Sequence, residues 1–154
     1  CLVNILIPGS ALTRWNTGCF ERSAMPEVLP TPQGDLTLRT PAMPRDANAA
    51  GDIFGGWVMA QMDSASGIRA VERARGRVVT AAVKEMSFEK PVKIGDTLCV
   101  YTQVTKIGRT SITLKVEAWA QRYLSEVMEM VTSAEFVMVA LDATGKPTPV
   151  PPEA

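Results

Sequence analysis

The stretch that decides the fold reads Asn48-Ala-Ala-Gly-Asp52-Ile-Phe-Gly55-Gly56-Trp57-Val-Met-Ala-Gln-Met-Asp63-Ser-Ala-Ser-Gly-Ile68. Its apolar residues recur at the spacing of a helix, and Gly76 marks the position where we expect that helix to stop. Placing residues at intervals of about 100° collects one broad stripe, made of Phe54, Val58, Gln61, Met62, Ala65 and Ile68. The opposite face is also small and apolar, with Met59, Ala60, Ser66, Gly67 and Ala70 around Asp63. We therefore expect a helix that is covered on both sides.

Asp63 is the only charged residue between Asp52 and Arg69. A carboxylate on an otherwise apolar helix loses solvation when it is buried, so it needs a partner or a functional role. Its mid-helix position argues against a capping role, and its spacing to Arg69 places the two on different faces, which argues against a local ion pair. We interpret Asp63 as a catalytic residue, acting either as a general base on water or as a nucleophile.

The paired glycines Gly55 and Gly56 precede Asp63 at the start of the helix. They suit either close packing of the helix on a sheet or the approach of a substrate to backbone N–H groups at a helix N-terminus. We favour the second interpretation, in which the Gly56 N–H polarises a carbonyl and stabilises an oxyanion. Asp52 is the competing carboxylate, but its place just before the helix favours a role at the helix dipole or as a cap.

The composition excludes several classes of function. The formal net charge of the 154 residues is zero, so we expect neither a nucleic-acid partner nor a membrane partner. The chain has no histidine, which excludes a Ser-His-Asp triad, a Cys-His pair and a His-ligated zinc site. Three cysteines without a CxxC pair favour a reduced compartment, the cytoplasm, with Cys99 as a buried apolar residue. A lipoprotein with a lipidated Cys1 is a less favoured alternative.

Beyond Gly76 the apolar residues change to the two-residue period of β-strands. We expect one strand before the helix, at 35–40, and four after it, at 78–88, 98–105, 111–118 and about 130–141, with a hairpin turn at 106–109. This order predicts a single α+β domain at 33–147, in which a curved antiparallel sheet of five to six strands wraps a long central helix. Residues 1–32 then form an irregular extension, and residues 148–154 a proline-rich tail.

An ordered set of stretches spans this domain: 38–44, 46–57, 61–63, 76–80, 86–88, 91–92, 95–96 and 106–111. Together they resemble the YciA-type bacterial acyl-CoA thioesterases of the hotdog fold, and the resemblance runs from about Leu36 to Pro147. It implies hydrolysis of fatty acyl-CoA to free acid and CoA, without a further cofactor or metal. It also implies a homo-oligomer, a dimer at least and in the family often a trimer of dimers, so we expect a homohexamer.

The resemblance also implies roles for individual residues. The family's catalytic aspartate matches Asp63, and its loop asparagine matches Asn48, which the opposing protomer contributes. We add Phe54 and Gly55 as substrate-binding residues beside Gly56. Two alternatives are a hotdog hydratase, disfavoured because that chemistry typically uses a His–Asp pair, and a non-catalytic acyl-CoA-binding or regulatory protein.

Isolated basic residues mark where the phosphates of CoA could bind. Such residues are usually solvated, but the pyrophosphate and 3′-phosphate of CoA need cations at the nucleotide end of the site. No P-loop or GxGxxG motif is present. The expected phosphate-binding residues are Lys106, Arg109 and Ser111 in the predicted hairpin turn, together with Arg77.

Overall fold

The computed structural model describes residues 30–152, so the expected extension at 1–32 lies almost wholly outside the described residues. The elements follow in the order β1 (Asp35–Pro41), the short 3₁₀ helix η1 (Pro44–Asp46), α1 (Gly55–Ala74), β2 (Val78–Phe88), β3 (Thr97–Ile107), β4 (Ser111–Gln121) and β5 (Met128–Ala140). Strand, helix and four strands is the order expected from the sequence, and the predicted β2 has the observed bounds.

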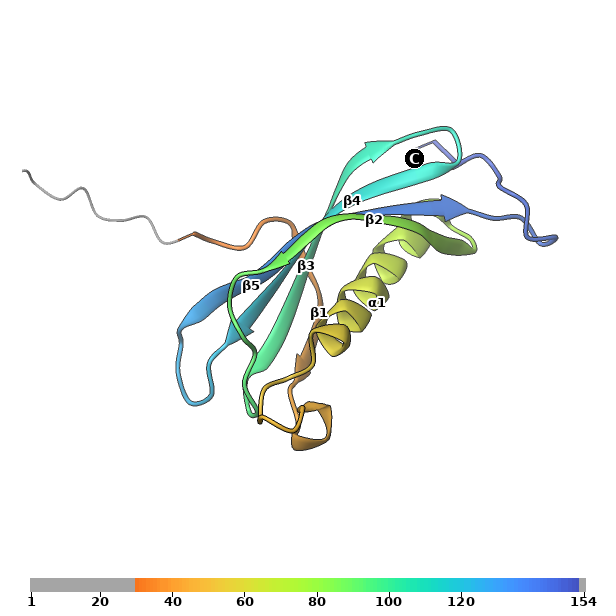
Figure 1. The fold of residues 1–154 in the computed structure, drawn as a ribbon. Coiled ribbons are helices and arrows are strands. Elements are labelled where there is room, and N and C mark those ends of the chain that lie inside the picture. Colours follow the sequence, from red (N-terminus) through yellow and green to blue (C-terminus); the bar gives the residue numbers. More distant parts are fainter. Residues whose placement is uncertain (1–29, 153–154) are drawn as a thin grey trace, which may run out of the picture. The chain divides into compact units, whose positions relative to one another are not determined.

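The five strands form one antiparallel sheet in the order β1-β3-β4-β5-β2, and α1 lies across one face of it (Figure 1). The alternation expected along β3 and β4 is confirmed, because the helix-facing residues Leu98, Val100, Ile112, Leu114 and Val116 are fully buried. They form one hydrophobic cluster with Val58, Met62 and Ala65 of α1. The long central helix is therefore held by a core that reaches every strand, which confirms the hotdog arrangement.

The end of α1 differs from the prediction by one residue. The left-handed residue that terminates the helix is Arg75, with φ 52°, and Gly76 comes after it. Val71 O accepts the Arg75 N–H at 2.8 Å, which satisfies one of the last carbonyls of the helix. Because β2 begins at Val78, the chain must reverse immediately after the last helical turn, and this places the turn residue before the glycine.

The prediction that α1 is covered on both sides is wrong for the single protomer. Val58, Met62 and Ala65 are buried as expected, but Phe54 and Ile68, assigned to the same stripe, are exposed. On the opposite face Ser66 and Ala70 are buried, whereas Met59 and Asp63 are exposed. The sheet reaches only one side of the helix, which leaves the other side open within the protomer.

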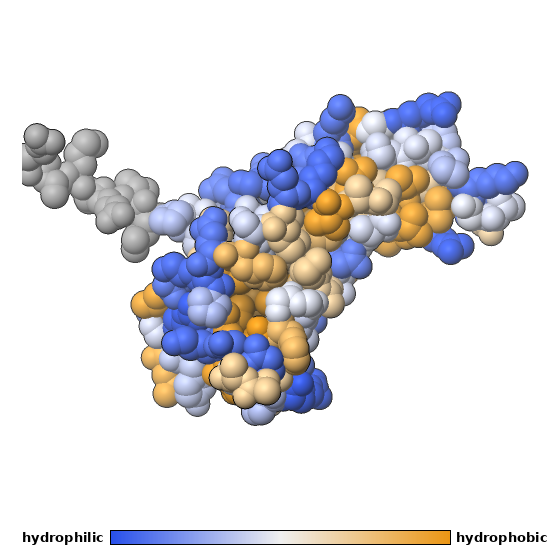
Figure 2. Space-filling view, in the orientation of Figure 1, coloured by the Kyte–Doolittle hydropathy of each residue, from blue (hydrophilic) through white to orange (hydrophobic). Residues whose placement is uncertain are grey.

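The exposed side of α1 continues onto β2, an edge strand of the sheet. Nearly every residue of β2 is exposed or half-buried, although the strand is rich in apolar side chains. Figure 2 shows hydrophobic surface gathered over the face on which α1 and β2 lie. The exposed large apolar residues of these two elements are Met59, Ile68, Val71, Val79, Val83 and Phe88. We call this set the α1–β2 face.

Candidate active site

Asp63 lies on the exposed side of α1, and its carboxylate is bound by a residue of the adjacent strand. The Thr80 hydroxyl donates a hydrogen bond to Asp63 Oδ1 at 2.5 Å. Thr80 is near the start of β2, and its hydroxyl also approaches the sulfur of Met138 at 3.4 Å. The expected absence of a local ion pair is confirmed, because Arg69 pairs with Asp35 and Glu72 instead. One carboxylate oxygen of Asp63, Oδ1, is thus oriented by Thr80, and within residues 30–152 Oδ2 accepts no hydrogen bond.

Thr80 is a functional candidate that the sequence interpretation missed. It appears only as the last residue of one stretch that resembles the thioesterases, and an uncharged strand residue gives no electrostatic signal of its own. Its position in the sequence could have identified it. Thr80 follows soon after the end of the helix, and a strand that runs back antiparallel to the helix passes the middle of that helix within its first few residues.

The N-terminus of α1 offers backbone donors, as expected. The N-cap residue Phe54 makes no side-chain hydrogen bond to the helix, and within residues 30–152 no acceptor faces the N–H of Gly55 or Gly56. The capping role expected for Asp52 is therefore not observed. Unsatisfied N–H groups and the positive end of the helix dipole together favour a negatively charged oxygen at this point.

The two glycines differ in their surroundings. A Cβ on Gly55 would lie 3.3 Å from the Phe88 ring, so this glycine allows the ring of β2 to pack closely on the helix without shifting. A Cβ on Gly56 would meet nothing within 4 Å, so packing within the protomer does not explain that glycine. The structural interpretation thus holds for Gly55, whereas the interpretation as an open approach to backbone suits Gly56.

Asn48 is placed in a tight loop just before the helix. Its Oδ1 accepts hydrogen bonds from the backbone N–H groups of Ala50 at 2.9 Å and Asp52 at 3.1 Å. Its own N–H donates to Asp52 O at 2.7 Å. The carbonyl of the side chain therefore holds the loop together, and the amide Nδ2 is the group left to donate to a substrate.

A cavity of about 290 Å³ opens beside the N-terminus of α1. Its walls are largely apolar, with Glu89 and Lys90 at the exposed β2–β3 loop; the apolar part includes Ile53, Gly55, Val58, Phe88, Val92 and Val131. Of the substrate-binding residues expected from the sequence, Gly55 lines this cavity and Phe54 does not. The cavity lies under the same helix turn that carries the free N–H groups.

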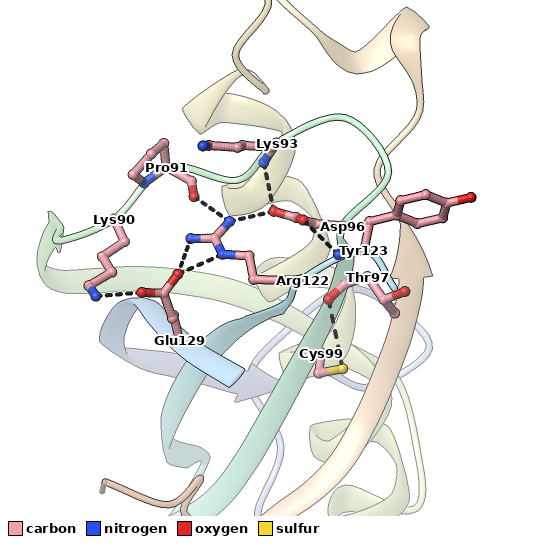
Figure 3. Close-up of polar contacts among 9 residues, drawn as sticks. All are labelled: Lys90, Pro91, Lys93, Asp96, Thr97, Cys99, Arg122, Tyr123 and Glu129. Carbon is pink, nitrogen blue, oxygen red and sulfur yellow. Dashed lines mark hydrogen bonds and ion pairs between the residues drawn. The ribbon is translucent and has the colours of Figure 1, made fainter. Parts of the chain in front are cut away.

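A network of charges holds the loop on which this cavity opens (Figure 3). Arg122, between β4 and β5, donates to Pro91 O at 3.1 Å, to Glu129 at 2.6 Å and to the Asp96 carboxylate. Burial alone would lower the pKa of Arg122, but its hydrogen bonds to Glu129 and Asp96 raise the pKa above its usual value. Hydrogen bonds from Lys90 and Arg122 likewise hold the pKa of Glu129 below its usual value.

The basic residues expected at the nucleotide end of the site gather at the other end of α1. Lys106, Arg109 and Ser111 belong to the hairpin between β3 and β4. The end of β5 lies between this hairpin and Arg77. Ala140 N donates to Thr110 O of the hairpin at 2.9 Å, and the next residue, Leu141, donates its N–H to Arg77 O at 2.8 Å. The structure thus brings the four expected residues to one edge of the molecule, remote from Gly56.

Within residues 30–152 no group of three or more His, Cys, Asp or Glu side chains could hold a metal ion. No helix within residues 30–152 is both long enough and apolar enough to cross a membrane.

Known proteins resemble this chain over most of its length. A family model described as thioesterase superfamily matches residues 50–124. The acyl-CoA thioester hydrolase YciA of Salmonella typhimurium is 51% identical over 124 residues, which are 79% of this chain and 93% of that protein. A hexameric broad specificity acyl-coenzyme A thioesterase of solved structure is 50% identical, with a TM-score of 0.76, and the match covers 80% of this chain and 86% of that one.

A more distant solved structure is informative about single positions. It is an acyl-CoA hydrolase from Staphylococcus aureus in complex with butyryl coenzyme A and coenzyme A, with 32% identity and a TM-score of 0.69, covering 74% of this chain and 70% of that one. Two of its variants with solved structures replace an aspartate and a threonine by alanine. Those two positions are 17 residues apart, which is also the separation of Asp63 and Thr80.

Proposed function

This chain belongs to the thioesterase superfamily, among the acyl-CoA thioester hydrolases of the YciA kind, and on that premise we propose how its residues hydrolyse an acyl-CoA. The reaction converts the thioester and one water molecule into a free acid and CoA. The observation that carries the assignment is the hydrogen bond from Thr80 to Asp63, because it orients an exposed carboxylate in the middle of α1.

Asp63 supplies the base or the nucleophile. As a base it takes a proton from water while the hydroxide adds to the carbonyl carbon, and the proton then goes to the leaving thiolate. As a nucleophile it attacks that carbon itself, expels CoA and forms an anhydride, which water then hydrolyses. In both routes Thr80 holds Oδ1, so Oδ2 is the reacting oxygen, and the hydroxyl donor keeps the carboxylate fixed in position.

Gly56 and Asn48 bind the thioester carbonyl. The Gly56 N–H lies at the positive end of α1, and no Cβ at this residue hinders the approach of a substrate. The second donor is Asn48 Nδ2, because Oδ1 of the same side chain is already hydrogen-bonded within the loop. These donors stabilise the oxyanion that forms when the carbonyl is attacked.

Helix geometry supports a site whose two halves come from different protomers. Gly56 and Asp63 are seven residues apart, so they lie about 10 Å apart along the axis of the same helix. The N–H groups at a helix start point away from the helix, so a carbonyl bound by Gly56 is farther still from its own Asp63. We propose that Asp63 and Thr80 of one protomer act with Gly56 and Asn48 of its partner.

The α1–β2 face is the proposed contact between these protomers. An edge strand with exposed apolar side chains pairs readily with another strand, and such pairing would bury exposed side chains of β2 such as Val79 and Val83. Related thioesterases of solved structure are hexameric. We propose a homohexamer built as a trimer of such dimers.

The substrate then spans the length of the helix. We propose that the acyl chain enters the apolar cavity beside Gly55, and that Arg77, Lys106, Arg109 and Ser111 bind the phosphates of CoA. No further cofactor takes part in the proposed steps. A buried, unpaired Cys99 supports a reduced compartment, and we propose the cytoplasm.

Release of free thiol from a panel of acyl-CoAs tests the assignment. We expect hydrolysis by the wild-type protein and a loss of about 10²- to 10⁴-fold in kcat for Asp63→Asn. A single turnover in water enriched in heavy oxygen separates the two routes, because only the nucleophile route leaves a heavy oxygen atom on the peptide that contains Asp63. Undiminished turnover by Asp63→Asn would refute the role of this residue.

A further inference from the structure

The loop between β2 and β3, residues 89–96, supports the start of α1. Ile53 N donates to Val92 O at 3.2 Å, and the backbone of Asp52 forms a β-bridge with Lys93. These contacts fix the two residues that lead into Phe54 and the paired glycines. The direction in which the Gly56 N–H points therefore depends on where this loop lies.

The same loop supports the segment that leads to Asn48. Ala42 N donates to Asp96 O at 2.8 Å, and Gly95 N donates back to Ala42 O at 2.9 Å. Ala42 is fully buried and precedes η1, which carries the chain toward Asn48. Both proposed carbonyl-binding groups are thus attached to one loop that supplies no reacting group, although its Val92 lines the proposed acyl cavity.

One side chain from outside the loop, Arg122, joins its two ends. Arg122 donates to Pro91 O near the start of the loop and to the carboxylate of Asp96 at its end, as Figure 3 shows. Asp96 is 4% exposed on its side chain and also accepts the backbone N–H of Lys93 at 2.9 Å. Glu129 holds the other edge of the guanidinium, with contacts of 2.6 and 2.5 Å. Only a planar cation with several donors can serve these three acceptors at once.

We propose that Arg122 is a positioning residue for thioester hydrolysis, which fixes loop 89–96 and through it places Gly56 and Asn48 at the substrate carbonyl. The proposal rests on the proposed function of those two residues. Arg122 itself touches neither Asp63 nor the helix start. Its effect should therefore appear in the rate of the chemical step, because a displacement of about 1 Å at a reacting centre can reduce the rate by about 100-fold.

The test compares Arg122→Gln with Arg122→Lys and with a matched control, Arg69→Gln. Arg69 also joins two carboxylates from different segments, Asp35 and Glu72, but it lies on α1 away from the loop. For Arg122→Gln in the intact oligomer we expect kcat to fall roughly 10- to 100-fold while KM changes less than about threefold. Arg122→Lys keeps the charge but not the planar fork, and should recover part of that loss. Arg69→Gln should keep the wild-type kcat.

Backbone amide exchange supplies a readout that does not depend on catalysis. We expect Arg122→Gln to speed exchange in peptides that cover 42–56 by about tenfold or more, because the Ala42 and Ile53 amides lose a fixed acceptor. Arg69→Gln should leave those peptides unchanged. If Arg122→Gln does not fold, kcat and amide exchange are compared between Arg122→Lys and Arg69→Gln instead.

Three results would overturn the proposal: unchanged exchange over 42–56, an unchanged kcat, or an equal loss of kcat in Arg69→Gln. The failure of the proposed function would look different. In that case the wild-type protein would release no thiol from any acyl-CoA, while the exchange measurement would still report whether Arg122 fixes the segment.

Discussion

Gly56→Ala should move stability and activity in opposite directions. A Cβ at this position meets nothing within 4 Å in the protomer, so the new methyl group fits without displacing a neighbour. Replacing glycine by alanine in a helix favours folding by up to about 1 kcal/mol, and less at the first turn than in the interior. The thermal midpoint should therefore stay the same or rise by a few degrees.

The same methyl group stands where the thioester carbonyl would approach the Gly56 N–H. Losing one oxyanion donor typically costs about 3 to 4 kcal/mol, which is roughly 10² to 10³ in kcat. Thiol release under saturating acyl-CoA measures this loss, and a thermal melt of the same sample measures stability. Gly55→Ala is the contrasting variant, because its Cβ would lie 3.3 Å from the Phe88 ring, which must shift to make room.

The reasoning fails if Gly56→Ala turns over like the wild-type protein in an unchanged oligomer. It also fails if activity and stability fall together, because Gly56 would then be a packing residue of the subunit contact. Sedimentation of the variant distinguishes that case, since a packing defect at the contact would shift the protein toward smaller assemblies.

Thr80→Ala should lower kcat about tenfold, which is the lower end of what a hydrogen bond to a charged group contributes. Thr80→Ser keeps the hydroxyl and should restore kcat, and steady-state kinetics of the two variants would check both expectations. Asp52→Asn should keep near wild-type thiol release, and a loss as large as that of Asp63→Asn would reverse the assignment of the two acids. Phe88→Ala should enlarge the cavity and raise kcat/KM for long acyl-CoAs relative to short ones, by roughly fourfold for each additional methylene that becomes buried. An unchanged ratio would show that the acyl chain binds elsewhere. The pKa of Glu129 is lower in the folded protein than in the unfolded chain, so Glu129 stabilises the fold above its unfolded pKa. This stabilisation is lost as the pH falls through the folded pKa. The thermal midpoint of Glu129→Gln should therefore decline less steeply below about pH 4.5 than that of the wild-type protein.

Local patterns predicted the elements well because their causes are local. The helical spacing around Val58 and Met62 and the alternation along β4 each report one face that packs against the core. The motif order placed Asn48 and Gly56 at the helix start and the basic residues at one end of the sheet. These features depend on residues that are close in sequence or share one element.

The remaining features depend on contacts that no local pattern reports. The covering of both faces of α1 failed as a prediction because the face that is exposed in the protomer carries apolar residues like those of the buried face. Thr80 is an uncharged strand residue, and the role proposed for it rests on its hydrogen bond to Asp63. Arg122 and Asp96 are 26 residues apart on different segments, so their joint hold on the loop is a property of the folded chain.

The separation of Gly56 and Asp63 by two turns of one helix has a genetic consequence. If each site draws on two protomers, a chain defective in Asp63 and a chain defective in Gly56 should complement each other. A mixed dimer then contains one site in which both defects meet and one site with neither. Random pairing of equal amounts makes half of the dimers mixed, so about a quarter of all sites would be intact. Two inactive alleles expressed together would thus restore measurable hydrolysis, although neither protein alone is active.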